Sequence, residues 1–266
     1  MSNISNSLLQ MNNIENMNQK NTVIHRMEPA VKLLITLMYL IVVISVNPYQ
    51  VSRLIPYLFY PVIGIILAEI SLRTMIKYLV IAMPFTLFTG ISNLFLNREI
   101  AFPMANVVIT QGMLSCCFVL LKSILTILAV VILTSTTSMD DLLYAMIHFK
   151  VPIIIVTQIM FTYRYIGVIA EEASIMYHGY ILRAPKAKAI KAKDMGPFLG
   201  QLIIRSFDRA ERIYQAMKCR GFEGYVSFSG KKGISGKGWF YVVITAGILI
   251  ALRLVNISIL LGKLFM

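Results

Sequence analysis

Two stretches of the chain, residues 33–52 and 78–97, contain no charged residue, although each is 20 residues long. A helix of about 20 apolar residues crosses the hydrocarbon core of a bilayer. Only 14% of the 266 residues are charged and 58% are hydrophobic, whereas about 25% are charged in a typical soluble domain. The sequence therefore predicts an all-α integral membrane protein and not a soluble enzyme.

Five apolar segments alternate with turn signals such as Asn47-Pro48. Pro84 lies inside the third segment and predicts a kink there. The residues that follow it, 97–111, are expected to form a loop, with a short re-entrant hairpin as one form of it. The expected spans are residues 31–46, 54–70, 78–96, 112–133 and 238–260.

Residues 151–170 are apolar enough to suggest a further span, but they carry polar side chains such as Gln158, Tyr163 and Arg164. The excess of Lys and Arg on the cytoplasmic side of membrane proteins decides between the two topologies. With the N-terminus inside and 151–170 not crossing, inner segments hold 20 of the 25 Lys and Arg, outer segments hold 3, and two lie within spans. We therefore predict five crossings, with residues 151–170 along the inner surface.

Two amphipathic helices are predicted between the fourth and the last span. Arg183–Lys237 contains 13 Lys and Arg against four acidic residues, a net charge of +9. The second helix is expected to start near Leu202 and to end at Gly221. Apolar residues recur at helical spacing at Ile166, Ile169, Ala173, Met176 and Tyr180, and again at Ile203, Phe207, Ala210, Tyr214 and Met217.

Four arginines of the second helix are predicted to lie opposite its apolar stripe. At 100° per residue they share an arc of about 80°, so we expect them to point away from the neighbour that the stripe contacts. These are Arg205, Arg209, Arg212 and Arg220. The basic charge alone fits nucleic acid, anionic lipid or an acidic protein, and its place between spans favours the cytoplasmic membrane face and not nucleic acid.

Catalytic and cofactor motifs are absent from the sequence. The only candidate for a nucleotide-binding loop, around Gly236-Lys237, is followed by Gly238 and lacks the required glycine at 231. The three histidines are scattered and the three cysteines have no metal-ligand spacing. We therefore expect no enzyme activity, no cofactor and no metal site, and expect the Gly-rich stretch 230–238 to be a linker.

Three polar features stand out, and the first two allow two interpretations each. Lys122 lies near the middle of the fourth span, where a charge either serves a function or snorkels or meets a backbone carbonyl. Arg183 and Arg220 each close an amphipathic helix, either for function or as ordinary charges at a helix C-terminus. Thr137 or Ser138 followed by Asp140-Asp141 predicts the capped start of a short helix over residues 142–149, which we interpret as structural.

Four motifs together resemble one family. They are His25-Arg26-Met27-Glu28-Pro29, Thr136-Thr137, Thr162-Tyr163-Arg164-Tyr165-Ile166 with Glu171-Glu172-Ala173, and Arg209–Met217 leading to Arg220-Gly221. Over residues 24–260 the chain resembles the transmembrane T component of energy-coupling factor (ECF) transporters, in particular the CbiQ-like subunits of cobalt and nickel importers. Ser138 stands where that family usually has proline.

The resemblance also implies which residues couple the chain to its partners. The family's two Ala-Arg-Gly motifs map onto Leu182-Arg183-Ala184 and Cys219-Arg220-Gly221. Both depart from the pattern, because Ala184 replaces glycine and Cys219 replaces alanine. Since both arginines are kept, we expect coupling to be kept.

What the resemblance implies is a non-catalytic scaffold in a bacterial or archaeal cell membrane. It binds two ATP-binding cassette ATPase subunits and a substrate-binding membrane (S-type) subunit. The resulting complex imports cobalt or nickel. Residues 1–24 are then a disordered cytoplasmic tail, 25–135 the first four transmembrane helices, 136–235 the cytoplasmic coupling region and 236–266 the last transmembrane helix. A general vitamin-type T component, a self-sufficient secondary transporter and a membrane-bound enzyme are the alternatives.

Overall fold

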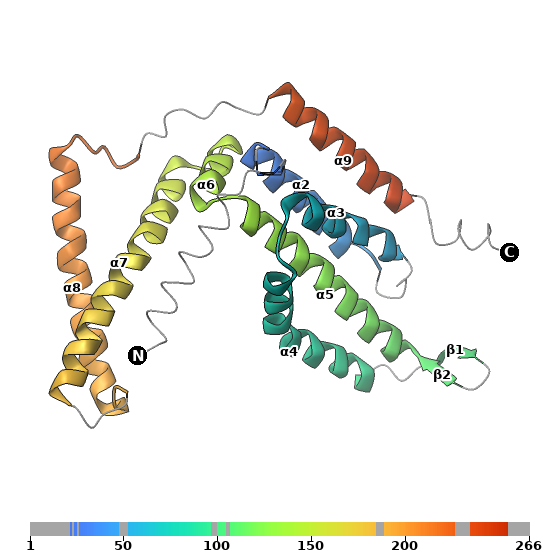
Figure 1. Ribbon diagram of the computed structural model, residues 1–266, viewed down its shortest axis with the longest axis horizontal. Helices are drawn as coiled ribbons and strands as arrows, with labels where there is room; N and C mark the ends of the chain where they lie inside the picture. The colour runs from blue at the N-terminus through green and yellow to red at the C-terminus, as the bar shows by residue number, and fades with distance from the viewer. Residues whose placement is uncertain are drawn as a thin grey trace. The chain divides into compact units, whose positions relative to one another are not determined.

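The computed structural model describes residues 22, 24–25, 27–47, 53–96, 100–104, 107–184, 189–226 and 235–254. It confirms the predicted all-α membrane fold (Figure 1). The tail predicted for residues 1–24 lies almost entirely outside the described residues. The helices are α2 (Pro29–Ile44), η2 (Ile55–Leu58), α3 (Phe59–Ala68), α4 (Leu72–Leu96), α5 (Gln111–Thr136), α6 (Met139–His148), α7 (Ile153–Arg183), α8 (Ala192–Cys219) and α9 (Gly236–Leu254).

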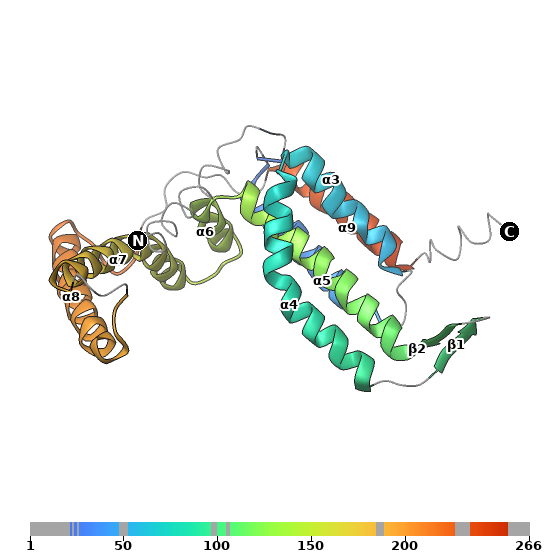
Figure 2. The same cartoon turned by 60° about the horizontal axis from the view of Figure 1, so that its bottom comes forward.

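Four helices in the described part of the chain are long and apolar enough to cross a membrane, namely α4, α5, α7 and α9. Two shorter apolar segments, α2 and η2–α3, cover the first two predicted spans. Pro84 lies inside α4, which bends along its length in Figure 2, as expected where a proline removes one helical hydrogen bond. The loop after α4 contains the antiparallel strands β1 (Ile100–Met104) and β2 (Val107–Thr110).

Two compact units divide the chain. Among the described residues, the bundle unit comprises those from 22 to 142 and from 235 to 254, and the α7–α8 unit comprises those from 143 to 226. In the bundle unit α2 packs against α5 and α9, and α3 and α4 pack against α5. Its core includes Tyr39, which is fully buried and donates from its hydroxyl to the carbonyl of Tyr57 at 3.0 Å.

Charged side chains join the helix ends of the bundle unit. The Lys32 ammonium donates to the carbonyl of Thr136 at the end of α5, at 2.7 Å. The Glu28 carboxylate accepts the backbone N–H of Ser235, just before α9, at 3.0 Å. A cation at a helix C-terminus and an anion at a helix N-terminus both complement the helix dipole. Two of the family-like motifs, at 25–29 and 136–137, therefore lie where α2, α5 and α9 begin or end.

The α7–α8 unit is an antiparallel pair of helices. The Tyr180 hydroxyl, near the end of α7, donates to the carboxylate of Asp194 in the first turn of α8, at 2.8 Å. Beyond the other end of α8, the Phe222 ring lies 6.0 Å from the ring of Phe161 on α7. The expected start of α8 near Leu202 is wrong, because the helix begins at Ala192. The bond between Tyr180 and Asp194 and the acidic first turn support these earlier residues.

The first amphipathic helix is longer than its apolar pattern indicated. Helix α7 runs without interruption from Ile153 to Arg183, so the ambiguous segment 151–170 and the amphipathic segment after it form one helix of 31 residues. A shorter prediction is confirmed at α6, where the Ser138 hydroxyl accepts the N–H of Asp141 at 3.2 Å and caps the helix.

Candidate functional site

A groove between α7 and α8 is lined by charged side chains from both helices. Glu172 contributes from α7, and Arg205, Asp208, Arg209 and Arg212 contribute from α8. Residues four positions apart lie about one helical turn apart on the same face. This spacing brings Arg205 and Arg209 to the same neighbour on α7.

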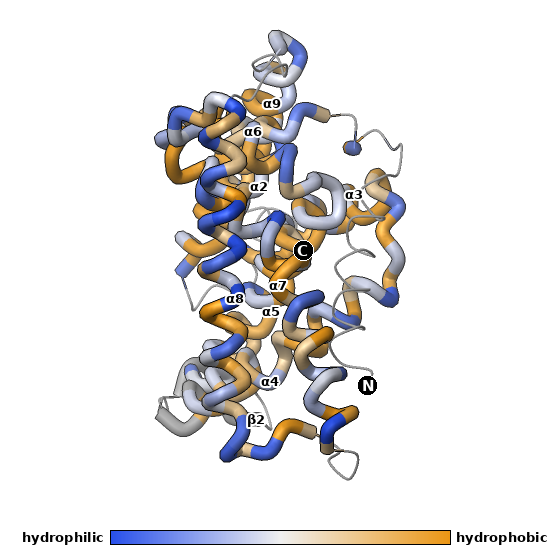
Figure 3. Tube along the Cα trace, turned by 90° about the vertical axis from the view of Figure 1, so that its left-hand side faces the viewer, coloured by the Kyte–Doolittle hydropathy of each residue, from blue (hydrophilic) through white to orange (hydrophobic). Residues whose placement is uncertain are grey.

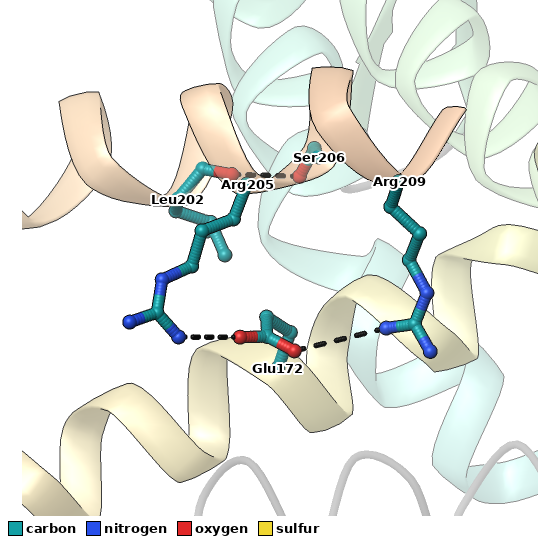
Figure 4. Close-up of polar contacts among 5 residues, drawn as sticks. All are labelled: Glu172, Leu202, Arg205, Ser206 and Arg209. Carbon is teal, nitrogen blue, oxygen red and sulfur yellow. Dashed lines mark hydrogen bonds and ion pairs between the residues drawn. The ribbon is translucent and has the colours of Figure 1, made fainter. Parts of the chain in front are cut away.

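That neighbour is Glu172, whose two carboxylate oxygens bind one arginine each (Figure 4). One oxygen lies 2.8 Å from Nη1 of Arg205, and the other lies 3.7 Å from Nη1 of Arg209. The expectation that the arginines all point away from the neighbouring helix is therefore wrong for these two. Sequence reasoning missed Glu172 as their partner, although a carboxylate on one helix and arginines at i and i+4 on the next could have suggested it.

The predicted apolar stripe of α8 is largely unpartnered within the α7–α8 unit. Ile203, Phe207 and Tyr214 are 56%, 72% and 47% exposed. The half-buried positions of α8 are Asp194, Phe198, Leu202, Ser206, Ile213 and Met217. Along α8 hydrophobic residues are interspersed with hydrophilic ones (Figure 3). An exposed apolar stripe of this kind is typical of a surface that meets a membrane or another protein.

Arg220 occupies the cap position at the end of α8, and Gly221 stops the helix. The N–H of Gly221 donates to the carbonyl of Lys218, and the N–H of Phe222 donates to the carbonyl of Met217, both at 3.0 Å. This pair of bonds defines a Schellman motif. Gly221 has φ +83°, a conformation that costs other residues about 1–2 kcal/mol. The arginine is exposed on the last turn.

Arg183 is the last residue of α7 and is also exposed. Ala184 caps the helix with φ −126°, and its N–H donates to the carbonyl of Tyr180 at 3.0 Å. Because this φ is negative, the cap has no need of glycine. The alanine that departs from the family pattern is therefore compatible with the same helix end.

The two arginines lie at opposite ends of the antiparallel pair. Arg183 lies near the start of α8, and Arg220 lies at its end. The 28 residues of α8 span about 42 Å at about 1.5 Å per residue. Two such distant guanidinium groups cannot serve one small binding site, but each can contact a different partner.

Lys122, in the bundle unit, has a structural partner. Its ammonium donates to the carbonyl of Ile44 at the end of α2, at 2.6 Å, and lies 5.2 Å from the ring centre of Phe118. Arg253 of α9 donates to the Ser45 hydroxyl beside it, at 2.9 Å. The structure thus shows the contact with a backbone carbonyl that one interpretation of Lys122 expects. A functional role for Lys122 stays a prediction. Among the described residues, no three His, Cys, Asp or Glu side chains are grouped as a metal site.

The family model for cobalt transport proteins, CbiQ, matches residues 20–232. The chain belongs to the CbiQ family. It is 26% identical to the energy-coupling factor transporter transmembrane protein EcfT of Clostridium kluyveri, over 76% of this chain and 80% of that protein. It is 25% identical to EcfT of Streptococcus equi subsp. equi, over 77% of this chain and 81% of that protein.

A third relative, EcfT of Bacillus subtilis, is 26% identical over 76% of this chain and 82% of that protein. The resemblance to T components of ECF transporters, drawn from four short motifs, is thereby confirmed. With its apolar helices, this membership makes the chain a multi-pass protein of the cell membrane.

Proposed function

We propose that this CbiQ-family chain is the coupling subunit of an ATP-driven importer. One ATPase subunit binds at Arg183 and a second binds at Arg220, and the α7–α8 pair passes their motion to a substrate-binding membrane subunit. The observation that carries this proposal is the placement of two exposed arginines at opposite ends of one antiparallel helix pair.

The chemistry of arginine suits such contacts. A guanidinium forms bidentate, charge-assisted hydrogen bonds with a carboxylate or with carbonyl groups in a partner's groove. The exposed stripe at Ile203, Phe207 and Tyr214 offers an apolar surface for the membrane-embedded partner. The chain itself hydrolyses no ATP in this mechanism, and a different polypeptide binds the substrate.

The proposed substrate is cobalt, or nickel. The family description as a cobalt transport protein and the Thr162–Ile166 motif, which resembles that of metal importers, support it. The EcfT name of the relatives favours the alternative of a general T component that serves vitamin-type substrate subunits. Uptake assays with cobalt, nickel and vitamins, in cells that express the chain with ATPase and substrate-binding subunits, distinguish the two.

Charge reversal at the helix ends tests the coupling role. We expect Arg220→Glu to abolish uptake and to reduce the ATPase subunits that co-purify with the chain, because loss of one charged contact buried at an interface costs about 2–5 kcal/mol. Arg183→Glu should have the same effect. The matched control is Lys218→Glu, which reverses a charge in the last turn of the same helix but about 200° around it.

Membrane insertion and yield should be unchanged in all three variants. Normal uptake with the ATPases still bound in both arginine variants would contradict the coupling role, and the arginines would then be ordinary charges at helix ends. A loss in the Lys218 variant equal to that in Arg220→Glu would mean that total charge matters at this end and Arg220 itself does not.

A further inference from the structure

A hollow of about 330 Å³ lies among the helices of the bundle unit. Its deep side is formed by α2 and α5, where Ile35, Thr36 and Ile132 are at most 9% exposed. Its rim is formed by α3 and α9, where Ile63 and Ile248 are 52% and 54% exposed. The hollow therefore opens between α3 and α9, and we call it the α3–α9 groove.

The threonine and lysine side chains in the lining use their donors elsewhere, and the ring hydroxyls of Tyr57 and Tyr60 are its other side-chain donors. Thr36 donates from its hydroxyl to the carbonyls of Lys32 and Leu33, Thr136 donates to Ile132, and Thr245 donates to Tyr241. The Lys32 ammonium donates to the carbonyls of Thr136 and His25. A polar ligand such as a vitamin or a hydrated metal ion needs several donors and acceptors placed for it. Apart from two tyrosine hydroxyls the groove offers it a mostly apolar lining, so it does not suit the transported substrate.

Water is a poor occupant because most of the lining is apolar. A water molecule held inside a protein makes about three hydrogen bonds to polar groups that lack other partners. An apolar hollow left empty loses the dispersion contacts of its lining atoms. The groove therefore favours a flexible apolar molecule that can enter from the side.

We propose that the α3–α9 groove binds one hydrocarbon chain of a membrane phospholipid. Both rim helices carry apolar residues of a membrane-embedded bundle, so lipid chains are the surrounding solvent at the mouth of the groove. The lining of α3 extends from Phe59 to Leu67, about 12 Å at 1.5 Å per residue. This length is close to the thickness of one leaflet, half of the hydrocarbon core of about 30 Å.

The groove gives the chain a lipid contact that differs from its outer surface. On the exposed face of α4, residues such as Phe85 and Phe88 are 75% and 76% exposed, and lipids there can exchange freely. In the groove, a lipid chain is surrounded by α2, α3, α5 and α9. An occupant of this kind would stabilise the packing of α3 and α9, which enclose it from opposite sides.

Photolabelling tests the proposal with the chain and its co-expressed partner subunits in vesicles of phosphatidylethanolamine and phosphatidylglycerol. The probe is a phosphatidylglycerol with a diazirine on one acyl chain, and labelled peptides are mapped by mass spectrometry. We expect labelling at Ile63 to exceed that at Phe85 and Phe88 several-fold. Ile248→Trp, which fills the rim, should lower labelling at Ile63 several-fold, and Ile250→Trp should not.

The control is closely matched, because Ile250 lies on the same helix and is 53% exposed but does not line the groove. Ile63→Trp, from the opposite rim, is a second variant that should lower labelling at Ile248. Equal labelling of the groove and the α4 face, or no effect of either tryptophan, would overturn the proposal. It would also be overturned if a photoreactive residue at position 63 cross-linked to a partner subunit or to another segment of this chain in place of lipid. Because transport is not the readout, the test does not depend on the proposed coupling function.

Discussion

Single residues decide how the two arginine-bearing helices end. At Gly221 the backbone has φ +83°, and both hydrogen bonds of the Schellman motif depend on it. At Ala184 the backbone has φ −126°, which any residue adopts. The two motifs therefore differ in the residues that they tolerate. The motif that ends at Gly221 needs its glycine, whereas the motif that ends at Ala184 does not.

Substitution of Gly221 should loosen the end of α8. We expect Gly221→Ala to cost about 1–2 kcal/mol of local stability, because alanine is forced into the left-handed region. The amides of Gly221 and Phe222 should exchange hydrogen faster, as measured by mass spectrometry, and uptake should fall because Arg220 is no longer held at a fixed cap. Gly200→Ala, inside α8 with no atom within 4 Å of the new methyl group, should instead stabilise its helix by about 0.5–1 kcal/mol. Unchanged exchange at residues 218–222 in Gly221→Ala would show that the cap does not depend on glycine.

Lys122 is a second residue with a definite geometric role. Its bond to the carbonyl of Ile44 joins α5 to the end of α2. We expect Lys122→Met to lower stability by about 1–3 kcal/mol, the cost of a carbonyl left without its charged donor. Uptake per folded molecule should stay normal, measured against the amount of complex in the membrane. A variant that folds and assembles normally but does not transport would instead support the functional interpretation of this lysine.

At the scale of elements, polar side chains link α7 to α8 at two places. Glu172 binds Arg205 and Arg209 near the middle of α8, and the Tyr180–Asp194 bond joins the helices at one end. The side chains of Glu172, Arg205 and Arg209 are 25%, 48% and 44% exposed, so each ion pair contributes about 1 kcal/mol or less. Motion at either arginine-bearing end is thus expected to reach both helices.

Removal of this carboxylate should weaken the contact between the two helices near the middle of α8. We expect Glu172→Gln to increase hydrogen exchange in residues 202–212 and to reduce uptake more than ATPase binding, because the ends stay intact while the link between them weakens. Glu171→Gln, at the exposed neighbouring position, is the matched control. A double-mutant cycle with Arg205→Gln isolates the pair. Additive effects of Glu172→Gln and Arg205→Gln would contradict a functional interaction between them.

The sequence predicts elements well where one periodic pattern extends along a helix and poorly where tertiary contacts decide. The predicted spans at α2 and α5 agree with the helices to within three residues, whereas α4 begins six residues before its predicted span. The start of α8 was predicted ten residues late, because the Tyr180–Asp194 bond that supports its first turns joins residues on two helices. The pairing of Glu172 with Arg205 was missed for the same reason, since helical periodicity describes one helix at a time. The helix stop at Gly221 was predictable because glycine is a local signal.

At the scale of the whole molecule, the number of membrane crossings depends on α7. Its length and composition would allow it to span a bilayer. The distribution of charge opposes a crossing, because the five-span arrangement places 20 Lys and Arg inside and 3 outside. If α7 crossed, either the loop before it, with Lys150, or the whole basic block after it would move to the outer side. Since cytoplasmic segments carry the excess of positive charge, the five-span arrangement is favoured.

Cysteine labelling at the two ends of α7 tests this topology. In a chain whose native cysteines are replaced, Lys150→Cys and Lys191→Cys place probes on exposed residues before and after the helix. We expect both to be protected from a membrane-impermeant maleimide in intact cells and to react once the cells are opened, because both ends of a surface helix lie on the cytoplasmic side. Arg53→Cys, in the predicted outer segment between the first two spans, should react in intact cells and serves as the control. Labelling of only one of the two flanking positions from outside would mean that α7 crosses the bilayer. The five-span arrangement would then be wrong, and Arg183 and Arg220 could reach cytoplasmic ATPases only if the basic block remained inside.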